Sequence, residues 1–194
     1  MWFAKVISVK CKGRAEMVRY ADDVVFCFED EESARGFYRA LKDRLKKFKL
    51  ELSEEKSKII KFGKNAGNEA GVFDFLGFTL ITGKSRKGTF CVKRMTSQKK
   101  LKAKRKVVKK WIWENMHTPI KLLIDKLNRK LRGHYNYYGV IGNSEAMRGF
   151  REYVLDRVKA SLNRRGANKD MTEGVFRKLI EVHPVALPRI VHRI

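Results

Sequence analysis

Residues 19–26 of this 194-residue chain read RYADDVVF, and the adjacent carboxylates of Asp22 and Asp23 decide how the first half of the sequence is interpreted. The residues on both sides of the pair, 17–20 and 24–28, are rich in β-branched and aromatic side chains, so they predict two short strands that meet at the Asp pair. Side chains alternate between faces along a regular strand, so only the tip of a tight hairpin brings neighbouring carboxylates toward one spot. The sequence therefore predicts a hairpin with both acids at its turn.

The chemistry of such a pair has two interpretations. Carboxylates held together repel one another, and oxygen ligands suit Mg²⁺ that is bound jointly with substrate phosphates. A pair of such ions stabilises the attacking and leaving oxygens of phosphoryl transfer. The alternative is an ordinary turn without chemistry, which the Asp-Asp dipeptide taken alone favours.

Charge is the second unusual property of the chain. Lys and Arg number 45 against 21 Asp and Glu, which gives a formal net charge of +24 at pH 7. Residues 93–194 carry 26 of the basic residues and only 8 of the acids, and residues 93–110 contain ten Lys or Arg and no acid. The expected partner is therefore a polyanion, with nucleic acid considered first and an acidic membrane surface second.

The basic run is expected to be a helix that is anchored on one side. The apolar residues within it and directly after it predict an anchored side, so the remaining face stays basic and suits a phosphate backbone. They are Leu101, Val107, Val108, Trp111 and Ile112. A solvated face with no partner is the alternative. Trp111 and Trp113 fall on different sides of the helix, so one of them is expected in the core.

Several other kinds of site are disfavoured by residue spacing. Cys11, Cys27 and Cys91 have no C-x-x-C pairing, which indicates free thiols in a reducing compartment rather than disulfides or a zinc site. The four His residues lack the spacing of metal ligands. No apolar run approaches the roughly 20 residues that span a bilayer, and the N-terminus does not read as a signal peptide. We therefore expect a cytoplasmic protein that does not enter membranes.

Residues 1–92 are expected to form an α+β unit. Asp30 is positioned to cap a helix whose apolar stripe includes Phe37 and Leu45. Two short strands separated by a turn are expected within residues 50–61.

More β-structure is expected at the end of this unit. Residues 73–80 form an apolar β-run interrupted by Gly77, and a Gly within a strand marks a bulge or the close approach of another group. A loop at residues 83–88 then leads into a strand at residues 89–92.

Residues 93–194 are expected to be helical and strongly basic. Residues 120–131 and 147–162 carry apolar side chains at helical spacing. A last short helix is expected within residues 170–180, after a capping arrangement at its start. The change in character thus coincides with the change in charge.

Several stretches together resemble group II intron reverse transcriptases. Tyr20-Ala21-Asp22-Asp23 is similar to the catalytic hairpin of that family, and residues 13–15 and 52–58 look like neighbouring elements of its palm. Residues 75–78, FLGF, are similar to the primer grip, which holds the growing 3′ end in the family. Residues 127–138, LNRKLRGHYNYY, resemble the signature of its maturase domain, also called the thumb or domain X. Four motifs in the family's order are more specific than any one of them.

The resemblance implies a partial reverse-transcriptase palm over residues 1–92 and an all-helical maturase domain over residues 93–194. It implies that Asp22 and Asp23 are catalytic carboxylates that bind Mg²⁺. In the family, the third catalytic Asp and the fingers precede this hairpin, and residues 1–15 contain no acid. We therefore expect a C-terminal portion that does not polymerise alone. No pattern like the family's HNH endonuclease follows.

The resemblance and the charge together imply a set of nucleic-acid contacts. Basic side chains would meet phosphates, aromatic rings would stack on bases, and the primer-grip turn would hold a strand. The expected residues are Tyr20, Phe75, Leu76, Gly77, Lys99, Lys100, Lys102, Lys104, Arg105, Lys106, Arg132, Tyr135 and Tyr137. For Tyr135 and Tyr137 a role in helix packing stays open, and for Tyr138 packing is favoured.

Three functions remain open from the sequence. The first is a fragment of an RNA-directed DNA polymerase that acts on a primer-template with a separately encoded N-terminal half. The second is a free-standing splicing helper that binds structured intron RNA. The third is an inactive remnant of a mobile element.

Overall fold

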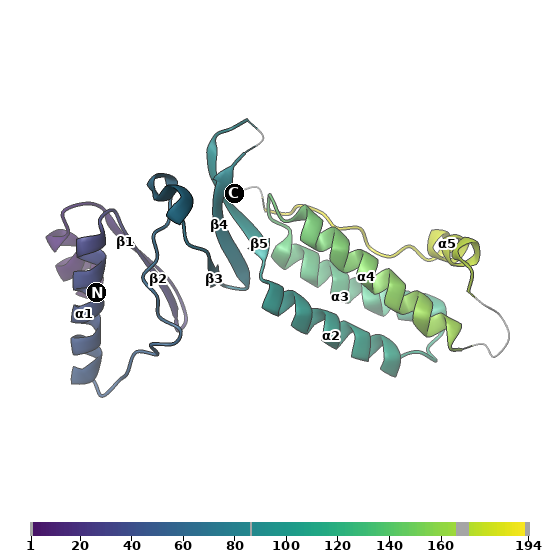
Figure 1. The fold of residues 1–194 in the computed structure, drawn as a ribbon. Helices are drawn as coiled ribbons and strands as arrows, with labels where there is room; N and C mark the ends of the chain where they lie inside the picture. Colours follow the sequence, from purple (N-terminus) through teal and green to yellow (C-terminus); the bar gives the residue numbers. More distant parts are fainter. Residues whose placement is uncertain (1, 86, 166–170, 193–194) are drawn as a thin grey trace. The chain divides into compact units, whose positions relative to one another are not determined.

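The computed structural model describes residues 2–85, 87–165 and 171–192 and divides the chain into two compact units, Met1–Gly71 and Val72–Ile194 (Figure 1). The fold is α+β, as predicted, with a two-stranded sheet in the N-terminal unit and a three-stranded sheet followed by helices in the C-terminal unit. None of the helices within the described ranges is long and apolar enough to cross a membrane.

The sheet of the N-terminal unit is a hairpin. β1 (Ala15–Tyr20) pairs antiparallel with β2 (Asp23–Phe28) along their full length. The next helix, α1 (Glu31–Lys47), begins where predicted, because the Asp30 carboxylate accepts a hydrogen bond from the Ser33 N–H at 2.7 Å.

An aromatic cluster forms the core of this unit. Phe3, from the short helix η1 (Phe3–Ile7), contacts Phe37 of α1 and Phe26 and Phe28 of β2, with ring centroids 5.0 to 6.0 Å apart. Phe26 and Phe28 also contact Phe37, at 4.5 and 5.4 Å. Only Phe3 and Phe37 of this cluster are nearly fully buried, 7% and 6% exposed. Val18 lies on the other face of the hairpin by strand alternation and is 54% exposed. The unit therefore has a thin core on one side of its sheet.

Around this core the unit has little regular structure. A second short helix, η2 (Ser8–Lys10), follows η1, and a 3₁₀ segment, η3 (Lys64–Glu69), lies near the end of the unit. The strands expected within residues 50–61 are absent; only the turn there is confirmed, by a 3.0 Å bond from the Ser57 N–H to the Ser53 carbonyl. A strand needs a neighbouring strand edge to supply its hydrogen bonds, and local composition does not provide one.

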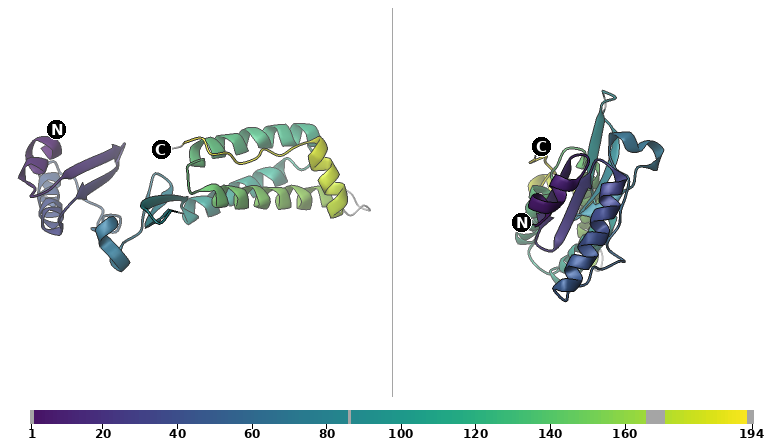
Figure 2. Two further views of the ribbon diagram at one scale, coloured as in Figure 1. Left: turned by 90° about the horizontal axis from the view of Figure 1, so that it is seen from above. Right: turned by 90° about the vertical axis from the view of Figure 1, so that its left-hand side faces the viewer.

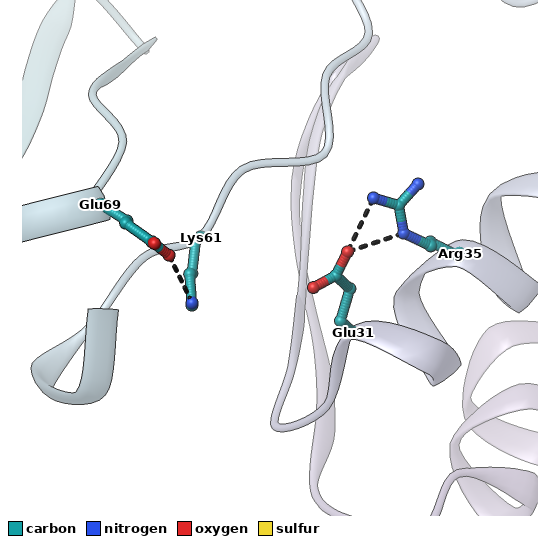
Figure 3. A network of polar contacts seen from close by, with 4 residues as sticks. All are labelled: Glu31, Arg35, Lys61 and Glu69. Carbon is teal, nitrogen blue, oxygen red and sulfur yellow. Dashed lines mark hydrogen bonds and ion pairs between the residues drawn. The ribbon is translucent and has the colours of Figure 1, made fainter. Parts of the chain in front are cut away.

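Exposed ion pairs lie on the surface of this unit (Figure 3). Glu31 pairs with Arg35 one helical turn on at 2.7 Å, and Lys61 pairs with Glu69 at 2.6 Å. All four side chains are more than half exposed, so solvent screens these pairs and they contribute little to stability.

The C-terminal unit begins with an antiparallel sheet in the order β3-β4-β5. The strands are β3 (Phe73–Phe75), β4 (Phe78–Lys84) and β5 (Phe90–Thr96). The sequence left open a bulge at Gly77, and the structure has none there. With Leu76, Gly77 forms a two-residue hairpin turn in which both residues have positive φ, 50° and 78°. Strand pairing in β5 continues past residue 92 to Thr96.

Helices make up the rest of this unit: α2 (Gln98–Glu114), α3 (Ile120–Tyr138), α4 (Ser144–Asn163) and α5 (Glu173–Val182). The predicted apolar stripes of α3 and α4 are confirmed as core. The buried members are Leu123, Ile124, Leu127, Leu131, Met147, Phe150, Val154, Val158 and Leu162.

The start of α5 partly follows the predicted capping arrangement. The Thr172 hydroxyl accepts a 3.4 Å hydrogen bond from the Val175 N–H, whereas Asp170 lies outside the described residues.

A C-terminal segment closes the helical core. Figure 2 shows residues 183–192 running back from α5 along the helices. Val185 of this segment is 2% exposed, and the Asn128 amide holds the chain on both sides of it by bonding the Pro184 carbonyl and the Ala186 N–H, at 2.9 and 2.8 Å. This segment therefore belongs to the core of the C-terminal unit.

Candidate catalytic hairpin and nucleic-acid interface

Asp22 and Asp23 lie at the tip of the β1–β2 hairpin, as the sequence predicts. Tyr20 pairs with Asp23, so Ala21 and Asp22 form a two-residue turn. Ala21 has a φ of 53°, a left-handed conformation that costs a non-glycine residue on the order of 1 kcal/mol. The Arg19 Nε donates a 2.8 Å hydrogen bond to the Ala21 carbonyl and supports this turn. Both carboxylates are exposed at the tip.

These two carboxylates have the donor chemistry that Mg²⁺ prefers. Mg²⁺ is usually held by one or two carboxylates together with substrate phosphates, so Asp22 and Asp23 fit such an ion. Within the part of the chain that the structure describes, no group of three or more His, Cys, Asp or Glu side chains is arranged to hold a metal. The pair is therefore suited to share an ion with phosphates and further ligands.

The β3–β4 turn packs against the end of α3. The Tyr137 hydroxyl donates a 2.8 Å hydrogen bond to the Leu76 carbonyl, and the Tyr137 ring stacks on Phe78 with centroids 5.8 Å apart. A Cβ at Gly77 would lie 2.9 Å from the Tyr138 Oη. The close approach predicted at Gly77 is therefore made by Tyr138 of the same chain.

Asn143 connects three elements behind this turn. Its side chain is 1% exposed, accepts a hydrogen bond from the Thr96 N–H and donates to the Thr96 hydroxyl and the Tyr138 carbonyl, each at 2.8 Å. The amide thereby joins the end of β5, the end of α3 and the start of α4. From the sequence, Asn143 is typical of a helix cap, yet its side chain makes no capping bond.

Asp74 ties the same turn to the start of α2. Its carboxylate accepts hydrogen bonds from the hydroxyls of Thr79 and Ser97, and these bonds, that from Thr79 first, lower the pKa of Asp74. The Ser97 N–H also donates to the Gly77 carbonyl at 2.9 Å. The turn that resembles a primer grip is thus fixed to both α2 and α3.

The basic face predicted on α2 is present. Lys99, Lys100, Lys102 and Lys106 are exposed, whereas the two remaining members of the predicted set are partly buried, namely Lys104 and Arg105. Leu101, Val108 and Ile112 anchor the opposite side in the core, whereas Val107, expected among the anchoring residues, is 61% exposed. Among the described residues, the only ion pair that involves α2 joins Lys110 to Glu114, at 3.6 Å. Within the described residues the predicted lysines therefore form no ion pair, and Lys99 contributes only to the lowered pKa of Asp74.

The aromatic residues in the predicted interface differ in exposure. Tyr20 and Tyr137 are 66% and 53% exposed, so their rings are accessible. Tyr135 is 1% exposed, and burial raises the pKa of its hydroxyl to about 12. The structure therefore places Tyr135 in the core, where its ring offers no face to a base, and Tyr138 is half-buried against the same core, as favoured from the sequence.

The predicted site residues fall into two groups. Tyr20, Asp22 and Asp23 lie in the N-terminal unit. The β3–β4 turn, the α2 residues, Arg132, Tyr135 and Tyr137 lie in the C-terminal unit, and Arg132 is exposed on α3. Sequence patterns missed the role of Asn143, because an Asn before a helix is typical of an ordinary cap.

Two family models match the chain. The model described as reverse transcriptase (RNA-dependent DNA polymerase) matches residues 2–80, which include the β1–β2 hairpin and the β3–β4 turn. The model described as the group II intron, maturase-specific domain matches residues 99–180, which include nearly all of α2 and all of α3 and α4. A search of curated proteins found no match.

Proposed function

Because the chain belongs to the group II intron-encoded reverse transcriptases and maturases, we propose that it binds structured intron RNA through the basic face of α2. The observation that carries this proposal is the set of exposed lysines on a helix anchored in the core, with no acid paired to them in the described chain. An anchored helix holds its charges at fixed spacing, which suits a phosphate backbone.

The strength of this binding depends on salt. Each Lys or Arg set against a phosphate releases condensed counterion, so affinity falls steeply as the salt concentration rises. Lys99, Lys100 and Lys102 lie at the start of α2. This end of the helix is next to the β3–β4 turn, as shown by the 3.8 Å distance between Lys100 Cγ and the position that a Cβ would take at Gly77. The turn at Phe75, Leu76 and Gly77 is proposed to hold a primer-template at the same end.

The β1–β2 hairpin is proposed to keep the metal chemistry of the family. Asp22 and Asp23 would hold Mg²⁺, which stabilises the attacking and leaving oxygens of phosphoryl transfer. A third carboxylate and a nucleotide-binding wall would come from outside these 194 residues, for example from a separately encoded N-terminal half. We therefore expect RNA-directed DNA synthesis only in such a complex, and RNA binding by the chain alone.

The domain division follows from these roles. Residues 1–92 are proposed as the partial palm and residues 93–194 as the maturase domain. Cys11, Cys27 and Cys91 are all free, which supports a reducing compartment such as the cytoplasm.

A free-standing splicing helper is the second candidate. The observation that favours it is the core of the C-terminal unit, which includes the sheet-to-helix network at Asn143 and the closing segment at Val185. We propose that such a unit folds by itself and presents the basic face of α2 to RNA.

The test compares the whole chain with two charge-reversed variants on structured intron RNA across a range of salt concentrations. Lys99→Glu, Lys100→Glu and Lys102→Glu together are expected to abolish most of the affinity. The control reverses the charges of Lys46, Lys47 and Lys49 near the end of α1. This variant has the same net charge as the first one and is expected to keep most of the RNA affinity. Equal affinity of wild type and the first variant would contradict the proposal.

A primer extension assay tests the polymerase part. The chain alone, with Mg²⁺ and a primer on an RNA template, is expected to give no extended product. Extension that Asp22→Ala abolishes would show that the carboxylates present are sufficient.

A further inference from the structure

The seam between α2 and α4 contains an unusual arrangement of charge. The two helices run parallel. Thr96 and Asn143, which precede α2 and α4, are hydrogen-bonded to each other, and Trp113 and Arg164, at the C-terminal ends of the same helices, are also in contact. These contacts place residues of α4 beside the basic helix, where sequence patterns indicated only packing.

Tyr153 of α4 carries a guanidinium from each helix on its ring. The Arg105 Cζ lies 5.2 Å and the Arg157 Cζ 5.5 Å from the ring centroid. The Tyr153 hydroxyl also lies 3.5 Å from the Arg105 carbonyl, and Arg105 Nη2 would be 4.0 Å from a Cβ at Gly149. One aromatic side chain thus holds a cation from each of the two helices.

Neither cation is neutralised within the described chain. The Nε atoms of Arg105 and Arg157 are buried without a hydrogen-bond partner there, and neither guanidinium joins an ion pair. The nearest acids on α4 in sequence, Glu152 and Asp156, are exposed and pair with neither arginine. A partly buried cation without an acidic partner is unfavourable, and contact with an aromatic ring offsets only part of that cost.

The same seam offers an aromatic surface further along. Trp113 is 53% exposed and holds the Arg164 Cζ 4.9 Å from its ring centroid. Arg105 and Trp113 are separated by about 12 Å along α2, at 1.5 Å per residue. The one acid of α2, Glu114, pairs with Lys110 rather than with this arginine.

We propose that Arg105 and Arg157 form a clamp across the two helices for a phosphate of an RNA backbone, and that Trp113 stacks an unpaired base of the same strand. The inference rests on the proposed RNA binding and deepens it, since it assigns α4 a direct contact and specifies a single-stranded segment as the ligand. A phosphate accepts two parallel hydrogen bonds from a guanidinium and neutralises both cations. Base stacking on an exposed indole tolerates any sequence.

The experiment measures binding of the whole chain to a single-stranded RNA oligonucleotide and to a fully paired RNA duplex at several salt concentrations. Arg105→Gln with Arg157→Gln is expected to lower the slope of log affinity against log salt, on the single strand, by about 0.7 for each phosphate that the variant no longer neutralises. Arg157→Lys keeps the charge, so the slope should stay while affinity falls. Arg148→Gln, exposed on the same helix without a ring contact, is the matched control and should change little.

The base contact has its own readout. Trp113→Ala is expected to weaken single-strand binding by roughly 5- to 150-fold and to leave duplex binding nearly unchanged. Ultraviolet crosslinking of the unaltered chain should join the oligonucleotide to Trp113, which requires no substitution. Absence of that crosslink would overturn the stacking contact. If the variant with Arg105→Gln and Arg157→Gln does not fold, the affinity of Arg157→Lys tests the clamp instead.

The remaining outcomes separate this inference from the proposed function. Steep salt dependence in the wild type with no change in the clamp variants would overturn the clamp while RNA binding stands. No RNA binding by the wild type would overturn both. Inorganic phosphate that binds the wild type and no longer binds the clamp variants, with RNA affinity unaltered, would mean a site for free phosphate and would also overturn the inference.

Discussion

Asn143 shows how much one buried amide contributes at the scale of a residue. Truncation by Asn143→Ala removes the partner of the Thr96 N–H and of the Thr96 hydroxyl oxygen in a buried site, whereas the Tyr138 carbonyl keeps a 2.8 Å bond from the Val140 N–H. Each unsatisfied buried group costs about 1–3 kcal/mol, so we expect the free energy of unfolding of the C-terminal unit to fall by about 2–4 kcal/mol. Urea denaturation followed by Trp fluorescence measures this change.

The control for that substitution is Asn136→Ala. Asn136 is exposed on α3, and its side chain accepts one long hydrogen bond, 3.3 Å, from Arg189. The expected reduction in stability is below about 1 kcal/mol, as for most exposed positions. Equal reductions in the two variants would contradict the role assigned to Asn143.

His134 makes the stability of the C-terminal unit depend on pH. It is 5% exposed between Tyr138 and Phe150, with ring centroids 4.7 and 4.3 Å away. Burial lowers the pKa of its imidazole from 6.5 to about 4, and the nearby Lys104 adds to this effect. Between pH 6.5 and pH 4 the unfolded chain therefore binds more protons than the native one.

The sign of the pH effect follows from that difference. Stability from neutral His134 is fully present above pH 6.5 and falls as the pH drops toward 4, by roughly 3 kcal/mol in total. His134→Phe removes the titrating group. The free energy of unfolding of the wild type should therefore fall relative to that of the variant as the pH drops from 6.5 to 4. The exposed His117 is the control, because His117→Gln should leave the pH profile of the wild type unaltered.

At the scale of an element, the β3–β4 turn depends on a residue without a side chain. Gly77→Ala imposes a φ of 78° on a residue with a Cβ and brings that Cβ to 2.9 Å from the Tyr138 Oη. Gly88 has nearly the same φ, 77°, with nothing within 4 Å of its Cβ position. Gly77→Ala is therefore expected to destabilise the unit by about 1 kcal/mol more than Gly88→Ala, measured by urea unfolding.

A double-mutant cycle checks the cause. Tyr138→Phe removes the hydroxyl that the new methyl group would meet, so Gly77→Ala should cost less in that background. If Gly77→Ala and Gly88→Ala lower the free energy of unfolding equally, the backbone conformation alone explains the effect and the contact with Tyr138 contributes nothing.

At the scale of the whole molecule, the two compact units have cores of different size. The N-terminal unit relies on Phe3 and Phe37, whereas the C-terminal unit buries a long series of side chains along its helices. We expect two unfolding transitions in urea, with the N-terminal unit first, because a hairpin with one covered face has little buried apolar surface.

The tryptophans report on these transitions separately. Trp2 lies 6.0 Å from Phe37, while Trp111 and Trp113 belong to α2. One variant keeps only Trp2 and another keeps only Trp111 and Trp113. Phe37→Ala should lower the free energy of unfolding reported by Trp2, and Phe150→Ala that reported by Trp111 and Trp113, each by about 3–5 kcal/mol. A single transition that both substitutions shift equally would show that the units unfold together.

Local patterns in the sequence determined the helices and the hairpin with the Asp pair. The stripes of α3 and α4, the cap at Asp30 and the turn before Asp23 depend on spacing along the chain, so they could be predicted from residue order. The basic face of α2 was equally predictable because it depends on composition. The short strands expected within residues 50–61 failed for the opposite reason, since a strand requires a partner that local sequence does not specify.

Only the tertiary structure decided what the polar and aromatic side chains do. Asn143 and Tyr135 have ordinary local contexts, and their burial depends on how β5, α3 and α4 pack together. The pair of guanidiniums on Tyr153 likewise arises because α2 and α4 lie side by side, although Arg105 and Tyr153 are 48 residues apart in sequence. Burial and contacts between distant segments are set by packing, which no repeat along the chain records, and this is the physical reason that sequence patterns alone did not identify them.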